Sequence, residues 1–343
     1  MSYTIDAYRG HMAPTRNLLD FALYVAYFPQ LVAGPIERAT HLLKQIAAPR
    51  IVTRPMIESG CFLILLGLFR KVAIADGVAP LVNGIFAKPE YFSRLKLCLG
   101  AARHAIQIYC DFAGFSDIAR GTSRLIGIDL MVNIRQPYFS RNITEFWRQW
   151  HISLSSWLRD YLYIPRGGNR RGTAATYRNL LFTMLLGGLW HGARWNFVIR
   201  GGLHGAYLAA HKLWLARGGG RSDTAPGTRI APGNIAGIAG TFLLVDLAWI
   251  FFRCPSLAAA IGFLQGIFAF RGGWEHLPWG LRGTTLAYAG LPLFTDLPDH
   301  AGHRQERMLD WPWGARSAIY AAMLFLLILL RPLDDTPFIY FQF

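Results

Sequence analysis

The stretch LLFTMLLGGLWHGARWNFVI, residues 180–199, places an ionisable histidine, His191, inside a run apolar enough to cross a bilayer. A polar side chain at membrane depth is costly unless it faces a cavity or a partner, so it is functional by default. The paired glycines Gly187 and Gly188, together with Gly192, weaken the helix there, and such backbone must be covered by protein or water. We therefore predict that His191 lines a cavity, although this stretch alone fits a structural histidine equally well.

The composition is that of a membrane protein. Hydrophobic residues make up 53% of the 343 residues, charged residues only 16%, and the mean hydropathy is +0.26. A soluble domain carries about 25% charged residues. The formal net charge of +15 is also typical of nucleic-acid-binding proteins, but Lys and Arg gather between the apolar runs. That pattern indicates cytoplasmic loops and lipid headgroup contacts, so we expect membrane lipid and no nucleic acid as a partner.

Neither the cysteines nor any nucleotide-binding motif indicates a bound cofactor. The cysteines lie in apolar stretches, without a CxxC pair and without histidines at metal-ligand spacing. We interpret them as free thiols and expect neither a disulfide framework nor a bound metal. A Gly-rich nucleotide fingerprint is also lacking from the sequence.

Ten apolar stretches are candidate membrane spans or half-spans. Several are shorter than the roughly 20 residues that a perpendicular helix needs, so some are expected to be re-entrant or tilted. They cover residues 19–33, 56–75, 77–87, 97–119, 180–199, 201–215, 235–252, 257–270, 284–297 and 315–330. We predict an all-α, polytopic membrane protein in which residues 1–343 form a single membrane-embedded domain. The Gly-, Pro- and Ser-rich residues 217–233 are predicted to be a flexible loop.

Residues 134–178 are predicted to form an amphipathic or re-entrant segment. Asn142, followed three residues later by Glu145, resembles a capping box that starts a helix near Ile143. One face of this helix carries the residues Trp147, His151, Leu154 and Leu158. Such a helix lies at the membrane or dips into it. For His151 the spacing alone favours an interfacial histidine between tryptophans over a catalytic one.

A basic turn follows this segment. The sequence YIPRGGNRRG, residues 163–172, places Arg166, Arg170 and Arg171 around a Gly-Gly pair. Guanidinium groups bind phosphates and carboxylates through charge-assisted hydrogen bonds. We expect the turn to bind a phosphate or an acidic partner, and contact with lipid headgroups stays an open alternative.

Two long motif blocks stand out: EFWRQWHISLSSWLRDYLYIPRGGNRRG (residues 145–172) and NLLFTMLLGGLWHGARWNFVIRGGLHG (residues 179–205). Shorter ones are YCDFAGFSDIARG (109–121), LVAGPIER (31–38), LAWIFFR (247–253) and the terminal FIYFQF. Together they resemble the membrane-bound O-acyltransferase family, in its branch of bacterial alginate O-acetylation proteins. The resemblance covers essentially the whole chain and implies a helical ring around a transmembrane tunnel.

The resemblance also assigns residues. The catalytic histidine of the family corresponds to His191 in LWHGA, and its second histidine to His151 in WHISLS. An imidazole is a fitting base for a hydroxyl at neutral pH, and His191 would act as that base or carry the acetyl group itself. His151 would orient the thioester or stabilise the oxyanion. The expected substrate-binding residues are Arg166, Arg170, Arg171, Asn196 and His204; for His204, a satisfied interior polar residue is as good an interpretation.

The activity implied by the resemblance is acyl transfer across a membrane. The donor would be acetyl-CoA or an acyl carrier on the cytoplasmic side, with no tightly bound cofactor. The acceptor would be the hydroxyls of an exported, alginate-like polysaccharide, reached with a periplasmic acetyltransferase partner by a multi-pass protein of the bacterial inner membrane. One alternative is another envelope acceptor, through peptidoglycan acetylation or teichoic acid D-alanylation. Another is a non-catalytic membrane component of polysaccharide export.

The chain departs from the family pattern at several points. Arg166 and Arg120 stand where an apolar residue is usual, and Arg200 stands where an aromatic residue is usual. Each adds charge near the expected tunnel and bears on substrate detail more than on the reaction class. The opening SYTIDAYRG resembles a point well inside the family, so upstream membrane segments are expected. Without them, the chain alone is expected to be poorly stable and weakly active.

Overall fold

The computed structural model describes residues 1–31, 34–218, 232–269, 279–302 and 306–332, and every regular element in these ranges is helical. The all-α prediction is therefore confirmed for these residues. Most of the predicted loop at 217–233 and the terminal FIYFQF lie outside them.

The described chain is built from α-helices, two π-helical segments and short 3₁₀ turns. The α-helices are α1 (Ser2–Tyr8), α2 (Leu18–Val25), α3 (Ala39–Ala47), α4 (Arg54–Leu68), α5 (Gly77–Ala87), α6 (Arg94–Leu125), α7 (Ile143–Gln149), α8 (Ile152–Leu158), α9 (Gly172–His191), α10 (Trp195–Ala216), α11 (Ile235–Arg253), α12 (Leu257–Phe268), α13 (Trp279–Gly302) and α14 (Trp313–Leu330). The π-helical segments are η2 (Phe69–Asp76), which joins α4 to α5, and η5 (Arg159–Tyr163), which extends α8. The predicted stretch 77–87 coincides with α5.

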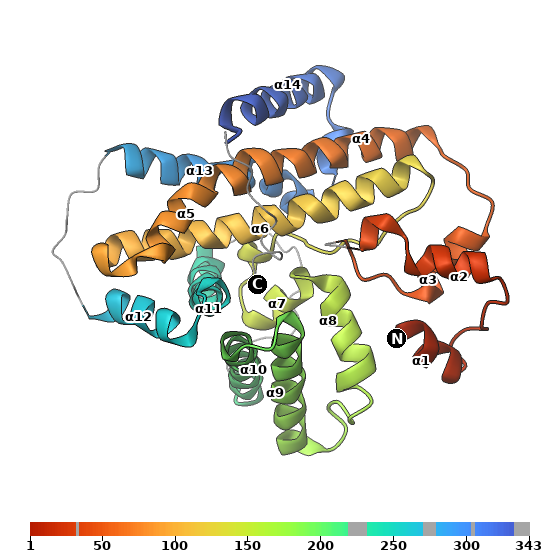
Figure 1. Cartoon of the computed structure of the whole chain (residues 1–343), viewed down its shortest axis with the longest axis horizontal. Coiled ribbons are helices and arrows are strands. Elements are labelled where there is room, and N and C mark those ends of the chain that lie inside the picture. Colours follow the sequence, from red (N-terminus) through yellow and green to blue (C-terminus); the bar gives the residue numbers. More distant parts are fainter. Residues whose placement is uncertain (32–33, 219–231, 270–278, 303–305, 333–343) are drawn as a thin grey trace.

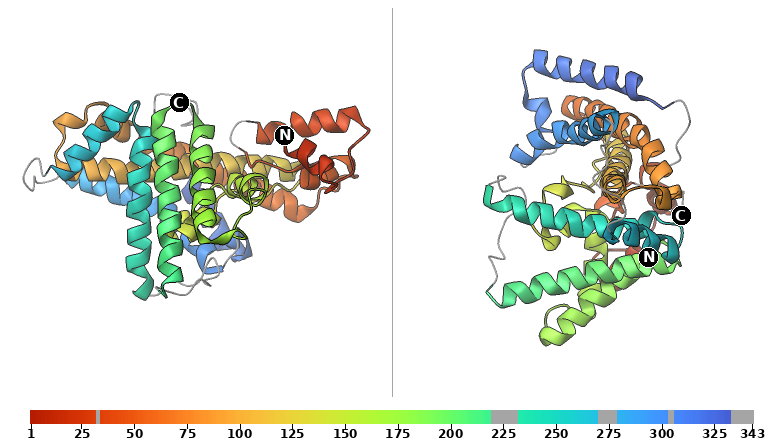
Figure 2. Two further views of the ribbon diagram at one scale, coloured as in Figure 1. Left: turned by 90° about the horizontal axis from the view of Figure 1, so that it is seen from below. Right: turned by 90° about the vertical axis from the view of Figure 1, so that its left-hand side faces the viewer.

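The long helices α4 and α6 lie side by side through the middle of the molecule (Figure 1). The close pairing depends on glycine: a Cβ on Gly67 would lie 2.5 Å from the carbonyl oxygen of Gly114, and one on Gly114 would lie 2.7 Å from that of Gly67. Helices α13 and α14 lie on one side of this pair, and α7 to α10 on the other (Figures 1 and 2). Helix α11 contacts both α6 and α10, and so connects the group α7 to α10 with the central pair of α4 and α6.

Aromatic side chains form much of the core where these groups meet. Phe69, Phe146, Trp150 and Trp249 are all less than 2% exposed and belong to one cluster. The rings of Trp150 and Trp249 meet edge to face with centroids 5.0 Å apart. The chain around residue 151 is therefore fixed against α11 by packing rather than left as a free amphipathic helix.

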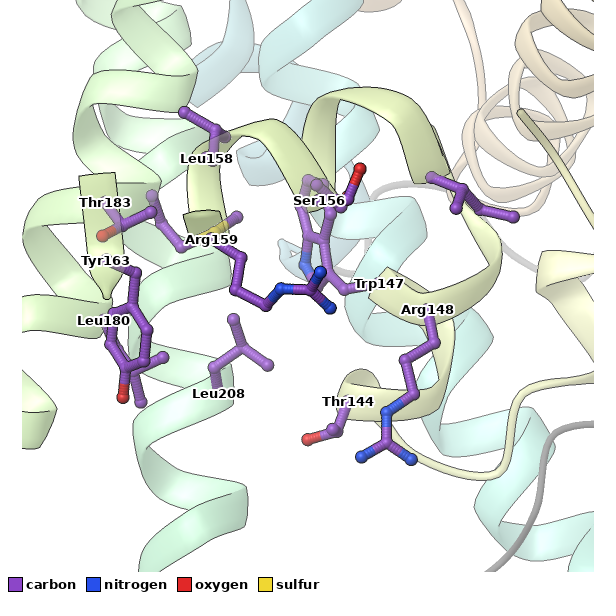
Figure 3. A pocket seen from close by; sticks show the side chains of 13 residues that line it. Thr144, Trp147, Arg148, Ser156, Leu158, Arg159, Tyr163, Leu180, Thr183 and Leu208 are labelled. Carbon is purple, nitrogen blue, oxygen red and sulfur yellow. The ribbon is translucent and has the colours of Figure 1, made fainter. Parts of the chain in front are cut away.

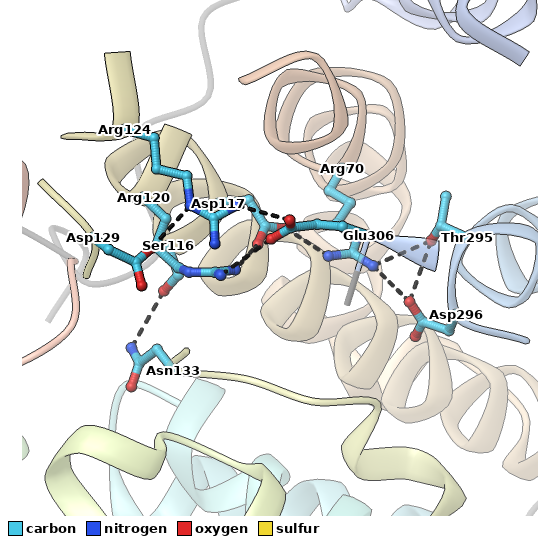
Figure 4. A network of polar contacts seen from close by, with 10 residues as sticks. All are labelled: Arg70, Ser116, Asp117, Arg120, Arg124, Asp129, Asn133, Thr295, Asp296 and Glu306. Atoms are coloured by element: carbon cyan, nitrogen blue, oxygen red, sulfur yellow. Dashed lines mark hydrogen bonds and ion pairs between the residues drawn. The ribbon is translucent and has the colours of Figure 1, made fainter. Parts of the chain in front are cut away.

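A buried ion network connects η2, α6 and α13 (Figure 4). Arg70 donates to Asp117 at 2.5 Å and to Asp296 at 2.6 Å, and Tyr109 also donates to Asp296. The Arg70, Asp117 and Asp296 side chains are each 6% exposed or less. Buried charges are tolerated only when paired in this way, so the network fixes how α13 lies on α6.

Arg120, one of the departures from the family pattern, belongs to this network. Its guanidinium lies 3.3 Å from Glu306 and 3.9 Å from Asp117, and Arg124 pairs with the same Glu306 at 2.7 Å. Its charge is therefore engaged between α6 and the segment after α13. It bears on the fold and not on the histidine site described below.

Two of the described helices are long and apolar enough to cross a membrane, α11 and α14, with mean hydropathies of 2.1 and 1.8. Ten apolar stretches are predicted from the sequence, and most of the others are too short or carry too many charges. Helix α6, for example, is long but holds Asp111, Asp117 and Arg120 in its buried face. On α14 the residues Leu324, Phe325, Ile328 and Leu329 are at least half exposed, as a lipid-facing surface requires.

Candidate functional site

His191 lies at the last residue of α9, directly before a sharp turn. Gly192 and Arg194 have extended backbones, and α10 begins at Trp195. The apolar stretch 180–199 is therefore divided between two helices, because the chain reverses at Gly192, one of the glycines expected to weaken the helix, and forms a hairpin of α9 and α10. The reversal puts His191 at the end of a helix, where its ring faces residues of the next helix.

The two helices of the hairpin touch at glycines. A Cβ on Gly188 would lie 2.2 Å from the carbonyl oxygen of Phe197, and a Cβ on Gly201 would lie 2.3 Å from that of Met184. No side chain fits at either position without moving backbone. This contact brings His191 close to residues that lie nine or more positions later in the sequence.

A small, partly open cavity lies where α9 and α10 meet, and we call it the histidine chamber. Its volume is about 10 Å³, close to the space that one water molecule needs. Three polar side chains line it, His191, Arg200 and His204. The remaining lining residues are Trp147, Leu154, Leu158, Met184, Gly187, Gly188 and Gly201. The prediction that His191 lines a cavity is confirmed.

Aromatic rings surround His191. The ring of Phe252 meets its imidazole at a right angle with centroids 5.4 Å apart, and the ring of Trp190 lies 5.1 Å away. Trp190 itself is 56% exposed, and Trp195 across the turn is 73% exposed. Exposed tryptophans of this kind are enriched at membrane–water interfaces.

His151 occupies a break between two short helices. The N-cap of the predicted capping box is confirmed, because Asn142 accepts a hydrogen bond from the Glu145 amide at 2.9 Å. The Glu145 carboxylate accepts from the Arg141 amide, one residue before the position that a capping box requires. The predicted single helix through His151 is wrong, because α7 ends at Gln149 and His151 adopts a left-handed backbone (φ 45°, ψ 55°) before α8. Non-glycine residues in that conformation cluster at functional sites.

Asn133 fixes the His151 ring. Its Oδ1 accepts hydrogen bonds from His151 Nδ1 at 3.1 Å and from the Ser153 hydroxyl at 2.8 Å, while its amide nitrogen donates to Ser116. Because Oδ1 only accepts, Nδ1 of His151 carries the proton and Nε2 is left as the basic nitrogen. Sequence reasoning misses Asn133, since no motif connects it to His151.

The two predicted catalytic histidines lie in the same region but do not share the chamber. The rings of His151 and His191 both contact Trp190, at 6.1 and 5.1 Å between centroids. His151 is 4% exposed and packs edge-on against Phe112, outside the chamber lining. His204 and Arg200 are the residues that the fold brings beside His191.

A larger pocket of about 430 Å³, which we call the groove, adjoins the chamber (Figure 3). The groove and the chamber share Trp147, Leu158 and Met184 as walls. The volume is within the range of small-molecule sites. Most of the exposed lining surface is apolar, although seven of the 13 lining residues are polar or charged. Its other lining residues are Thr144, Arg148, Ile152, Ser155, Ser156, Arg159, Tyr163, Leu180, Thr183 and Leu208.

Two arginines provide the positive charge of the groove. Arg159 extends into it, and Arg148 lies near Thr144 at one end (Figure 3). Arg159 also pairs with Asp160, which accepts from Arg38 as well. Partial burial acts to raise the pKa of Asp160, but the hydrogen bonds from Arg159 and Arg38 outweigh it and hold that pKa below its usual value. Sequence reasoning does not assign Arg148 or Arg159 to a site; their position beside the apolar stripe is the available signal.

The predicted basic turn lies next to the groove. Arg170 lines a pocket of about 290 Å³ that also includes Arg159 and the Gly167–Asn169 backbone. Arg166 stacks on Phe182 at 3.9 Å, and Arg171 packs its side chain near Gly167. Of the three predicted arginines, Arg170 is therefore the one that faces a pocket beside the groove.

The two other predicted substrate-binding residues have different surroundings. Asn196 is buried and donates to the carbonyl oxygen of Cys254 at 2.8 Å, which ties the start of α10 to the end of α11. It does not line the chamber. His204, in contrast, is 1% exposed and lines the chamber directly.

The model of the membrane-bound O-acyltransferase family matches residues 11–249, more than half of the chain. The chain belongs to this family. It is 47% identical over 274 residues to the probable alginate O-acetylase AlgI of Azotobacter vinelandii, a match that covers 80% of this chain and 52% of the relative. It is 41% identical over 368 residues to the protein of the same name in Pseudomonas putida, covering 100% of this chain and 73% of the relative.

A relative with a different acceptor in its name is also similar. The peptidoglycan O-acetyltransferase of Helicobacter pylori is 38% identical over 258 residues, covering 75% of this chain and 48% of the relative. The chain thus spans about half the length of the Azotobacter and Helicobacter relatives. The family and these relatives identify it as a bacterial membrane protein of the O-acyltransferase class.

Proposed function

We propose that this protein is an O-acetyltransferase that moves an acetyl group from a thioester donor to hydroxyl groups of an exported, alginate-like polysaccharide. The observation that carries the proposal is the groove that adjoins a one-water chamber holding His191. A thioester arm is long and mostly apolar, whereas its reacting carbonyl is small. A groove beside a small chamber with a basic side chain fits both parts.

The chemistry in the chamber would be base-assisted acyl transfer. A hydroxyl is a poor nucleophile at neutral pH, and His191 would take its proton and return it to the leaving thiolate. Covalent transfer through the imidazole is a second route open to the same residue. The small volume of the chamber excludes bulk water, and so favours transfer over hydrolysis.

Acetyl-CoA is the donor we propose. Arg148 and Arg159 in the groove and Arg170 beside it supply positive charge along the approach to the chamber. Guanidinium groups suit the phosphates of coenzyme A or of an acyl carrier arm. The chamber would take the carbonyl oxygen of the thioester, because its volume is about that of one water molecule and leaves no room for a long acyl chain.

For the acceptor, the alginate O-acetylase names of the more identical relatives support a polysaccharide. The Helicobacter relative supports peptidoglycan as a second candidate. We further propose a multi-pass protein of the inner membrane, arranged as a helical ring and working with a periplasmic acetyltransferase partner. The basic turn would face the cytoplasm, in line with the excess of Lys and Arg in cytoplasmic loops.

The acceptor is tested with membrane vesicles that contain the full chain and radiolabelled acetyl-CoA. We expect label in alginate oligosaccharide, and none in a peptidoglycan fragment supplied at the same concentration. Label only in the peptidoglycan fragment would move the assignment to the second acceptor. Absence of transfer to either, in vesicles that also contain a periplasmic acetyltransferase partner, would contradict the proposed function.

The orientation is tested by cysteine labelling. Asn169 is exposed at the basic turn, and Asn169→Cys in a Cys61→Ser background removes the labelling of the exposed native thiol. We expect a membrane-impermeant maleimide to react only from the cytoplasmic side. Reaction only from the periplasmic side would overturn the proposed orientation.

A further inference from the structure

The histidine chamber contains two polar residues that general-base chemistry at His191 does not use. Arg200 and His204 lie one turn apart on α10 and both line the chamber. Arg200 is 3% exposed and His204 is 1% exposed. Buried polar side chains beside a reacting group are positioned to act on it, because no bulk water competes for them.

The imidazole ring of His204 packs against aromatic side chains, whereas its two nitrogens form no hydrogen bond with the described residues. Its imidazole lies parallel to Phe146 at 6.1 Å and edge to face with Trp147 at 5.0 Å between centroids. Neither ring nitrogen has a hydrogen-bond partner among the described residues. A phenylalanine would fill the same space without the penalty of unpaired polar atoms, so packing alone does not account for a histidine.

Arg200 brings a fixed positive charge to the same place. Its guanidinium carbon lies 4.4 Å from the ring centroid of Trp249 and 4.7 Å from that of Phe252. Cation–π contacts hold a guanidinium by its faces, whereas its N–H groups donate in its plane, so the two kinds of contact do not compete. Phe252 also contacts His191, so the charge is positioned by the same ring that packs against the expected base.

We propose that Arg200 and His204 bind the carbonyl oxygen of the acyl thioester and stabilise the oxyanion that forms on it. This inference rests on the proposed function. The acceptor oxygen bonds to the carbonyl carbon, its proton passes to His191, and the C=O electron pair moves onto the oxygen. Collapse reforms the C=O bond and breaks the C–S bond, and the thiolate takes the proton back from His191. Arg200 and His204 donate hydrogen bonds throughout and are not consumed.

Removal of a donor that acts on a developing oxyanion lowers kcat more than it raises KM. We expect Arg200→Met to lower kcat about 10²- to 10³-fold, as removal of one oxyanion donor does elsewhere, while KM for acetyl-CoA changes little. Arg200→Lys keeps the charge and should recover part of the loss. His204→Phe should lower kcat by a smaller factor and leave the thermal midpoint unchanged or higher, because it removes unpaired buried atoms.

The experiment measures release of coenzyme A thiol from acetyl-CoA by the full chain in vesicles, with and without alginate oligosaccharide. Hydrolysis and transfer both place an oxyanion on the same carbonyl oxygen, so thiol release reports on its stabilisation in either reaction. We expect slower release without the oligosaccharide, because the chamber disfavours hydrolysis. The matched control is Arg253→Met, because Arg253 also lies over an aromatic ring, Phe86 at 5.7 Å, but outside the chamber. It should keep wild-type kcat.

The two proposals fail in different ways. If the wild type releases thiol only when His191 is present, and Arg200→Met and His204→Phe keep kcat within about threefold of wild type, the oxyanion site is overturned and the function stands. The oxyanion site is likewise overturned if His204→Phe loses activity and thermal stability together, as a purely structural residue would. If the wild type releases no thiol, the proposed function fails, and the oxyanion site with it.

Discussion

Two regions of the molecule bury an arginine: the ion network between α6 and α13, and the histidine chamber between α9 and α10. The side chains around the two arginines differ. In the network, Arg70 lies within 2.6 Å of two carboxylates. In the chamber, Arg200 lies over two aromatic rings, beside a histidine whose nitrogens lack partners among the described residues. Charges that neutralise one another stabilise a fold, whereas polar groups that line a cavity can act on a substrate.

The largest effect on activity is expected in the chamber. His191→Ala should lower the rate of acetyl transfer by roughly 10²- to 10⁴-fold, the usual contribution of a general base, without changing the amount of protein in the membrane. Transfer rate and membrane content are measured in the same vesicles. His11→Ala is the control, because the His11 side chain is 60% exposed. A His191→Ala protein that keeps most of its activity would remove the contrast between the two regions.

The network should show the opposite behaviour. Arg70→Met leaves Asp117 and Asp296 buried without the guanidinium that contacts both, and breaking a buried ion pair in this way costs about 3–5 kcal/mol. We expect a large fall in the thermal midpoint in detergent. Arg54→Met is the control. Arg54 pairs with Glu58, but its side chain is 89% exposed, and exposed ion pairs contribute about 0–1 kcal/mol.

A second variant tests the reason for that loss. Adding Asp117→Asn and Asp296→Asn to Arg70→Met removes the two buried charges that Arg70 balanced, so part of the stability should return. If the triple variant is no more stable than Arg70→Met, lost packing and not unpaired charge explains the effect.

A substitution at the close contact between α9 and α10 should lower both the stability of the protein and its activity. Gly188→Ala places a methyl group 2.2 Å from the Phe197 carbonyl oxygen, and overpacking of this kind costs about 1–3 kcal/mol. Transfer should fall as well, because His191 moves relative to α10. Gly84→Ala on α5 is the matched control, since a Cβ there meets nothing within 4 Å. Equal thermal midpoints for the two variants would show that the hairpin is not tightly packed.

The smallest effect is expected at Asp160, at the edge of the groove. Its pKa is lowered in the folded protein, so its contribution to stability is complete above the unfolded value of about 4 and is lost only as pH falls below it. Asp160→Asn should therefore shift the thermal midpoint equally at pH 5 and pH 8. The shift should correspond to less than about 1 kcal/mol, because the pair is partly exposed. A shift that differs between the two pH values would contradict the lowered pKa.

Local signals in the sequence predict the helices well. The N-cap at Asn142, the bounds of α5 and the apolar stretches of α11 and α14 depend on neighbouring residues, and each is found where the sequence predicts it. The sequence does not predict the break at His151, and at Gly192 it predicts a weakened helix but not the reversal of the chain. The break and the reversal arise from contacts with Asn133 and with α10, which no periodicity reports.

The candidate site, too, is predicted only as far as local sequence signals allow. Motifs identify His191 and His204, and the fold brings them to one chamber. Arg200 stands out in the sequence only as an unusual residue, because its position depends on Trp249 and Phe252, about fifty residues later. Helical spacing puts Arg148 and Arg159 on the polar flanks of one helix, whereas the bend after α7 directs them into the groove.

The glycine contact between α9 and α10 has a consequence for the timing of the reaction. Because backbone lies against backbone at Gly188 and Gly201, we expect the hairpin to move as one rigid body. The spacing between His191 on one helix and Arg200 and His204 on the other then stays constant during thermal motion. The groups that would meet the developing charge are already in place when the donor arrives, so little reorganisation energy is added to the barrier.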